Sequence, residues 1–124
     1  MQQQLLGVTV RCWSADTDWA KEQVADVVIE ALACTIPLAY QQAMAQQSSA
    51  PLWLNLEYLS AEQWVEGCHA LPSPQPHLPL QKYFFFPGFT AATGGLLQEA
   101  NLQQQAAAFI ANQAAQQAFW ANLG

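Results

Sequence analysis

Short apolar runs alternate with amphipathic stretches along the chain, and this alternation indicates its fold. Runs rich in β-branched, aromatic or leucine residues predict strands. The expected strands are residues 7–13, 25–30, 52–56 and 82–86. The run at 25–30 has an unbroken apolar centre, which is typical of a parallel strand buried on both faces.

Three other segments have helical character. Pro37 suits the first turn of a helix, because its missing N–H would lack a partner there in any case. Ser60 and Gln63 form a candidate capping box at the start of a short second helix. The C-terminal stretch is rich in Ala, Gln and Leu, with apolar residues partly at helical spacing and Gly124 as a candidate C-cap. The expected helices are residues 38–46, 60–66 and 96–123.

A proline-rich segment separates the third and fourth predicted strands. Residues 67–79 contain four prolines, and each proline removes a backbone donor and fixes φ. We therefore expect a loop without regular structure there.

Alternating strands and helices predict a parallel sheet with helices on its faces, a Rossmann-like α/β fold. The 124 residues suffice for one domain, residues 1–124. An open parallel edge needs a cover, so a chain that opens with a strand and closes with a helix is expected to be part of something larger.

Composition narrows the classes of partner. The chain is 52% hydrophobic and 10% charged, and its three basic residues face nine acidic ones, so nucleic acid and anionic membranes are poor candidates. The N-terminus has no basic flank and only a short apolar run, so neither a signal peptide nor a spanning helix is expected. Three cysteines without a CxxC pair fit a reducing compartment. We expect a soluble, cytoplasmic protein.

Glu57 and Tyr58 directly follow a predicted strand, where open α/β sheets place their ligand crevice. A carboxylate there could hold a guanidinium through two hydrogen bonds, and Tyr58 could stack on its plane. The alternative is a carboxylate at a helix N-terminus beside a packing tyrosine. Glu66 and His69 could share this site, or they could be solvated surface residues.

Glycine and aromatic residues offer weaker candidates. Gly94 and Gly95 could present N–H groups to a phosphate, although two glycines are far from a phosphate-loop motif. The aromatic run at 83–86 could form a wall for a sugar, but such a run in a strand is more often core. The cysteines and histidines form no complete ligand set, so no metal is expected.

Several long segments resemble one known family. They read WLNLEYLSAEQWVEGCH at 53–69, LPSP at 71–74 and KYFFFPGFT at 82–90, with ADVVIEA at 25–31 and TGGLL at 93–97. Together they are similar to the elongation factor P maturation arginine rhamnosyltransferases over almost the whole chain.

The resemblance implies an inverting glycosyltransferase with two Rossmann-like domains, the GT-B arrangement. Its donor would be dTDP-β-L-rhamnose and its acceptor an arginine of elongation factor P, with no cofactor and no metal. In the family the C-terminal domain binds the nucleotide, and the chain resembles only the acceptor-side N-terminal domain. The aspartate proposed as general base lies upstream of the matched region, so no catalytic residue is assigned here. The candidate substrate-binding residues are Glu57, Tyr58, Glu66, His69, Gly94 and Gly95.

These comparisons predict part of a protein-arginine rhamnosyltransferase that is inactive by itself. The alternative is a non-enzymatic module that recognises elongation factor P. A self-sufficient nucleotide-binding domain is disfavoured, because no glycine-rich strand-to-helix turn is present. The resemblance also implies that the family's first strand lies upstream of the matched region, and loss of this central sheet partner suggests marginal folding or a stabilising homo-oligomer.

Overall fold

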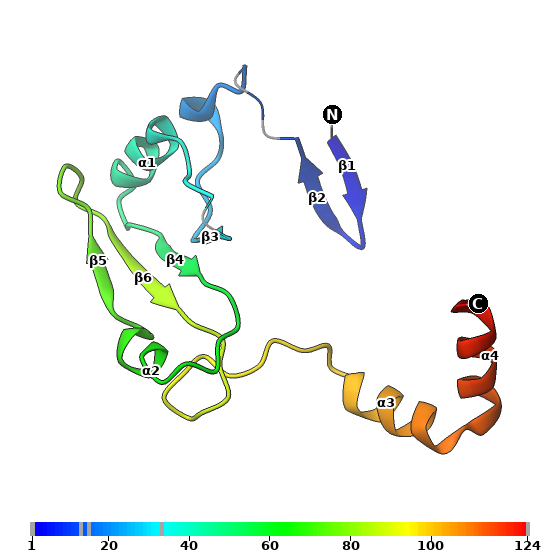
Figure 1. The fold of residues 1–124 in the computed structure, drawn as a ribbon. Helices are drawn as coiled ribbons and strands as arrows, with labels where there is room; N and C mark the ends of the chain where they lie inside the picture. Colours follow the sequence, from blue (N-terminus) through cyan, green and yellow to red (C-terminus); the bar gives the residue numbers. More distant parts are fainter. Residues whose placement is uncertain (1, 13, 15, 33, 124) are drawn as a thin grey trace.

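The computed structural model describes residues 2–12, 14, 16–32 and 34–123. Figure 1 shows the elements along the chain. The strands are β1 (Gln2–Leu5), β2 (Val8–Arg11), β3 (Val27–Ala31), β4 (Leu52–Leu56), β5 (Pro72–Pro74) and β6 (Gln81–Phe85). The helices are the 3₁₀ turn η1 (Trp19–Lys21), α1 (Leu38–Ala45), α2 (Val65–Cys68), α3 (Leu102–Ala111) and α4 (Gln113–Leu123).

The main sheet has four strands in the order β3-β4-β6-β5. β3 pairs with β4 and β4 pairs with β6, both in parallel, while β5 runs antiparallel to β6. Helix α1 connects β3 to β4, as expected of a βαβ unit. The predicted α/β sheet with parallel strands and flanking helices is confirmed.

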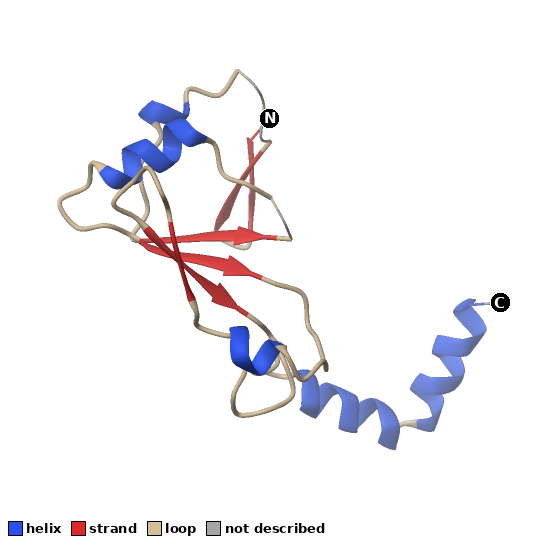
Figure 2. Ribbon diagram, turned by 60° about the vertical axis from the view of Figure 1, so that its left-hand side comes forward, coloured by secondary structure: helices blue, strands red, loops and turns tan. Residues whose placement is uncertain are grey.

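One face of this sheet packs against α1 and holds the core. Pro37 occupies the N-cap position directly before α1, whose bounds agree with the predicted helix to one residue. Met44 of α1 is fully buried and packs with Val28, Trp53 and Leu80 from the sheet segment. These contacts anchor α1 on one face of the parallel strands (Figure 2).

The opposite face of the sheet is open. Val27 and Ile29 of β3 are 50% and 56% exposed, whereas their neighbours Val28 and Glu30 are buried. The expectation that β3 is buried on both faces is therefore wrong for the described part of the chain. Its continuous apolar sequence still fits a strand with an apolar face on each side.

The strand predicted at 7–13 is found at Val8–Arg11, but it does not join the main sheet. It pairs with β1 as an antiparallel hairpin (Figure 1). The two loop residues Leu6 and Gly7 have φ of 50° and 83°, the positive values that a type I′ turn requires. Trp13, the last residue of the predicted strand, lies outside the described residues.

The expectation that residues 67–79 lack regular structure is wrong at β5 and at the last two residues of α2, Gly67 and Cys68. Proline is tolerated in an edge strand when its nitrogen does not face the neighbouring strand. The flanking amides make the bonds to the β6 segment: Ala70 N–H donates to Phe84 O at 2.8 Å and Gln75 N–H to Leu80 O at 3.2 Å. Ser73, between the two prolines, is opposite Lys82.

Two helix predictions need correction. The second helix begins at Val65 rather than residue 60, and Ser60 Oγ accepts the N–H of Glu62 rather than that of Gln63, so no capping box forms. The C-terminal helix begins at Leu102 rather than residue 96 and is broken at Asn112. The backbone of Asn112 is extended, and its Oδ1 accepts the N–H of Ala115 at 3.0 Å. Asn112 thereby starts α4 as a cap. Gly124, the predicted C-cap, lies outside the described residues.

Gly94 permits a close contact that no other residue could make. Its N–H donates to Phe86 O at 2.8 Å, and a Cβ at this position would lie 2.4 Å from Cζ of Phe85. We therefore expect Gly94→Ala to lower the free energy of unfolding by about 1–3 kcal/mol, the usual cost of overpacking. Urea denaturation would measure this loss.

Gly67→Ala is the matched control, because a Cβ there meets nothing within 4 Å. Gly67 lies within α2, where Ala is the better helix former. Adding Phe85→Leu to Gly94→Ala should restore part of the lost stability. Equal effects of Gly94→Ala and Gly67→Ala would contradict the proposed collision.

Candidate functional site

The carboxyl ends of β3, β4 and β6 lie at one edge of the sheet, where open α/β sheets bind ligands. Two chain segments continue side by side from this edge. Glu57 N–H donates to Phe85 O at 2.9 Å, and Ser60 N–H donates to Pro87 O at 3.3 Å. These bonds hold the polar segment after β4 against the turn that follows β6.

Glu57 is positioned by a neighbouring side chain. Asn55 Nδ2 donates a hydrogen bond to Glu57 Oε1. A carboxylate can accept about four hydrogen bonds, so the second oxygen retains capacity for a cationic donor. Tyr58 follows immediately and is 63% exposed, so its ring is accessible to a flat cationic group.

A small pocket lies beside this segment. It has a volume of about 160 Å³. Its lining residues are Ser60, Ala61, Glu62, Val65, Glu66, Phe89, Thr90 and Thr93. Trp64 Nε1 donates a hydrogen bond to Glu62, and the ring centroids of Trp64 and Phe86 lie 5.4 Å apart in an edge-on arrangement. The pocket itself combines the carboxylates of Glu62 and Glu66 with the ring of Phe89.

The charge distribution favours a cationic ligand at this edge. Each of the three basic side chains is already in an ion pair. The pairs are Arg11 with Glu22, Lys21 with Asp18 at 2.7 Å, and Lys82 with Glu30 at 2.6 Å. The hydrogen bond from Lys21 lowers the pKa of the Asp18 carboxyl below its ordinary value. Within the described residues, no basic side chain neutralises Glu57, Glu62 or Glu66.

His69 lies at the same edge, but contacts with Phe85 and Phe86 hold its ring in place. Its Nδ1 accepts the N–H of Phe86 at 3.1 Å, and its ring meets Phe85 edge-on at 5.2 Å. Gly95 has φ of 73°, and its carbonyl accepts the N–H of Gly88 at 3.1 Å. These contacts of His69 and Gly95 shape the turn around the end of β6.

The structure brings the predicted site residues to one region. Some of them contact the end of β6, and two others are exposed to solvent. Glu57, His69 and Gly94 all contact Phe85 or Phe86, whereas Tyr58 and Glu66 are exposed beside them. Their roles in substrate binding stay predictions. The pocket formed with Phe89 and Thr93 was not predicted from the sequence, because the turn that carries these residues has no periodic pattern.

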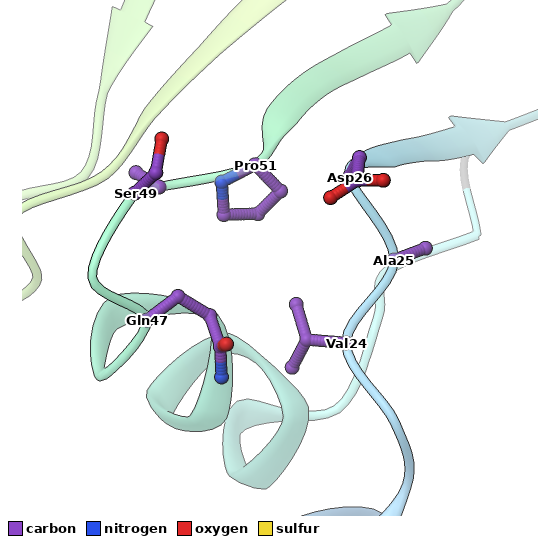
Figure 3. Close-up of a pocket in the computed structure, with 7 residues that line it drawn as sticks. Val24, Ala25, Asp26, Gln47, Ser49 and Pro51 are labelled. Atoms are coloured by element: carbon purple, nitrogen blue, oxygen red, sulfur yellow. The ribbon is translucent and has the colours of Figure 1, made fainter.

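A second pocket lies at the opposite, amino-terminal edge of the sheet. It has a volume of about 130 Å³ and lies between the end of α1 and the starts of β3 and β4. Figure 3 shows Asp26, Gln47 and Ser49 around its mouth. None of the predicted site residues lines it, so we place the candidate site at the carboxyl edge.

The described residues show neither a metal cluster nor a membrane-spanning helix. They contain no group of three or more His, Cys, Asp or Glu side chains that could hold a metal ion. None of their helices has the length and apolar character needed to cross a membrane.

Comparisons with known proteins agree on one family. The sequence model described as Elongation-Factor P (EF-P) rhamnosyltransferase EarP matches residues 1–124. The protein-arginine rhamnosyltransferase of Pseudomonas putida is 55% identical over 123 residues, which are 99% of this chain and 32% of that protein. Its Pseudomonas aeruginosa counterpart is 54% identical over 118 residues, covering 95% of this chain and 31% of that protein.

A more distant relative extends this similarity. The protein-arginine rhamnosyltransferase of Neisseria meningitidis serogroup B is 45% identical over 93 residues, 74% of this chain and 23% of that protein. The chain therefore spans about a third of the length of the Pseudomonas relatives, which are similar to it along nearly all its residues.

Proposed function

The chain belongs to the elongation factor P rhamnosyltransferase family, and from this membership we propose that it forms the acceptor side of a protein-arginine rhamnosyltransferase. The donor is dTDP-β-L-rhamnose and the acceptor is an arginine of elongation factor P. The complete enzyme has the GT-B arrangement, acts in the cytoplasm and needs no cofactor.

The observation that supports an acceptor role is the acidic and aromatic carboxyl edge. Glu57, oriented by Asn55, can accept two N–H bonds from a guanidinium, and Tyr58 can stack on its plane. Glu62 and Glu66 add negative charge beside them. A binding site for arginine needs these properties and no metal.

In the proposed reaction, a guanidinium nitrogen attacks the anomeric carbon of rhamnose. The bond from that carbon to the dTDP oxygen breaks, dTDP leaves with the electron pair, and the attacking nitrogen loses a proton. We assign the base that takes this proton, and the nucleotide-binding domain, to parts of the enzyme outside these 124 residues. The chain contributes orientation of the acceptor, which can supply a large part of a rate enhancement.

A chimera gives the direct test of this function. The 124 residues of this chain would replace the matching third of the Pseudomonas putida relative, to which the match is 55% identical. Incubated with dTDP-rhamnose and unmodified elongation factor P, the chimera should add one deoxyhexose, as read by intact mass. A folded chimera that binds both substrates and transfers nothing would contradict the assignment.

The isolated 124-residue chain should show no transfer in the same assay. Losing a general base costs about 10² to 10⁴ in rate, and absence of the donor domain should remove turnover altogether. The intact Pseudomonas putida relative is the positive control. A deoxyhexose on the acceptor after incubation with the chain alone would refute this expectation.

The second candidate function is a non-enzymatic module that recognises elongation factor P. The exposed Tyr58 and Phe89 beside three carboxylates would serve such a module equally well. A pull-down with labelled factor separates the two functions when it is combined with the chimera. Binding by the chain together with an inactive chimera would favour the module.

A further inference from the structure

The face of the sheet opposite α1 carries a continuous apolar surface, which we call the open face. Its side chains lie in cross-strand rows defined by the strand register. The rows are Val27 with Leu52, Ile29 with Leu54 and Tyr83, and Ala31 with Leu56 and Phe85. Parallel sheets normally have both faces covered. The apolar residues of the open face are therefore typical of a sheet face covered by a further layer of structure.

The chain itself reaches this face just before its C-terminal helices. Ile29, Leu54, Leu56 and Phe85 line an apolar pocket of about 170 Å³ together with Leu97. Leu97 thus borders this pocket near the carboxyl ends of β4 and β6, and α3 begins five residues later at Leu102. Continuity of the chain places α3 next to the surface that needs cover.

Helix α3 has an apolar stripe that matches the open face in chemistry. Leu102, Ala106, Phe109 and Ile110 recur at helical spacing on one side, and all four are exposed. No residue from 102 to 123 is charged. Docking this stripe would therefore bury apolar surface on both partners without removing any charge from water.

The dimensions also match. A ten-residue helix is about 15 Å long, and a five-residue strand is about 16 Å long. A helix that starts at the carboxyl edge, where Leu97 lies, would run back toward the amino edge. That is the direction in which α1 already runs on the other face, between the end of β3 and the start of β4.

In the arrangement of Figures 1 and 2, α3 and α4 reach away from the sheet, and α3 is exposed along its whole length. Isolated helices this short are marginal in water. We propose that α3 is a docking segment that folds onto the open face, with Leu102 near Leu56 and Ile110 near Leu52. Helix α4 moves with α3, because the rings of Phe109 and Phe119 join the two helices with their centroids 5.8 Å apart.

This inference is independent of the proposed function, and disulfide trapping tests it. The full 124-residue chain would carry Leu52→Cys and Ile110→Cys, with the three native cysteines replaced by Ser. On oxidation this variant should form an intramolecular disulfide, at a rate that does not depend on protein concentration. Ala111→Cys with Leu52→Cys is the matched control, because residue 111 points about 100° further round the helix, away from the stripe.

Three outcomes would overturn the proposal. The first is disulfide-linked dimers whose yield rises with protein concentration, which would assign the open face to a second copy. The second is equal trapping by the Ala111→Cys control. The third is no disulfide at all. A variant without cysteine changes gives an independent reading. Ile110→Asp should lower the thermal midpoint more than Gln104→Asp, whereas equal midpoints would show that α3 stays undocked.

Discussion

Replacing Lys82 by methionine should lower the free energy of unfolding by about 3–5 kcal/mol, the usual effect of removing one partner of a buried ion pair. Lys82 Nζ lies 2.6 Å from Glu30 Oε2, and the Glu30 side chain is only 2% exposed. The ammonium also lies 4.9 Å from the ring centroid of Trp53. Methionine keeps most of the packing but leaves the carboxylate buried without its cation.

Urea denaturation followed by tryptophan fluorescence would measure this change. Lys21→Met is the control, because the Lys21 side chain is 83% exposed and should have little measurable effect. Adding Glu30→Gln to Lys82→Met should recover much of the loss. The glutamine carries no charge, and its oxygen can still accept the N–H of Ile36, which now donates to Glu30 Oε1 at 2.9 Å.

Failure of this rescue would mean that Lys82 acts through packing rather than through its charge. A double variant as unstable as Lys82→Met alone would be that result. Equal losses from Lys82→Met and Lys21→Met would show that the Glu30–Lys82 pair contributes no more than a surface pair.

The second large effect concerns transfer to the acceptor. In the chimera with the Pseudomonas putida relative, Glu57→Gln should lower kcat/KM for elongation factor P by about 100-fold, because a misplaced reactant commonly costs that much. The change keeps the side-chain shape and an acceptor for Asn55 Nδ2, so it isolates the negative charge. Initial rates of deoxyhexose incorporation would measure it.

Glu99→Gln removes the same charge from an exposed residue in the segment before α3, which does not line the pocket beside Glu57. It should leave the rate unchanged. Both variants should melt at the temperature of the parent chimera, since Glu57 is not a core residue. A Glu57→Gln chimera that transfers at the parent rate would remove Glu57 from the acceptor site.

The parallel core could be predicted from the sequence because its signals are local. Residues 52–56 form an apolar run between turn signals, and Pro37 marks the start of α1. The hairpin β1–β2 escaped prediction because its turn is Leu6-Gly7 rather than the usual Asn-Gly or Asp-Gly. Strand β1 consists mostly of glutamine, which gives no apolar alternation.

The site was only partly predictable, because its parts are joined by contacts distant in sequence. Glu57 was found from its place after a strand, but its bond to Phe85 spans 28 residues of chain. The pair Glu30–Lys82 spans 52 residues. A sequence signal existed in that case. A glutamate near the end of an apolar strand and a lysine before aromatic residues each need a partner of opposite charge if they are buried.

The prolines of β5 determine how the main sheet can be extended. β5 is one rim of the sheet, and the nitrogens of Pro72 and Pro74 have no hydrogen to offer a further strand. The other rim is β3, whose backbone carries no such block. Growth of the sheet, whether by additional segments of a longer polypeptide or by a neighbouring molecule, is therefore directed to β3 alone.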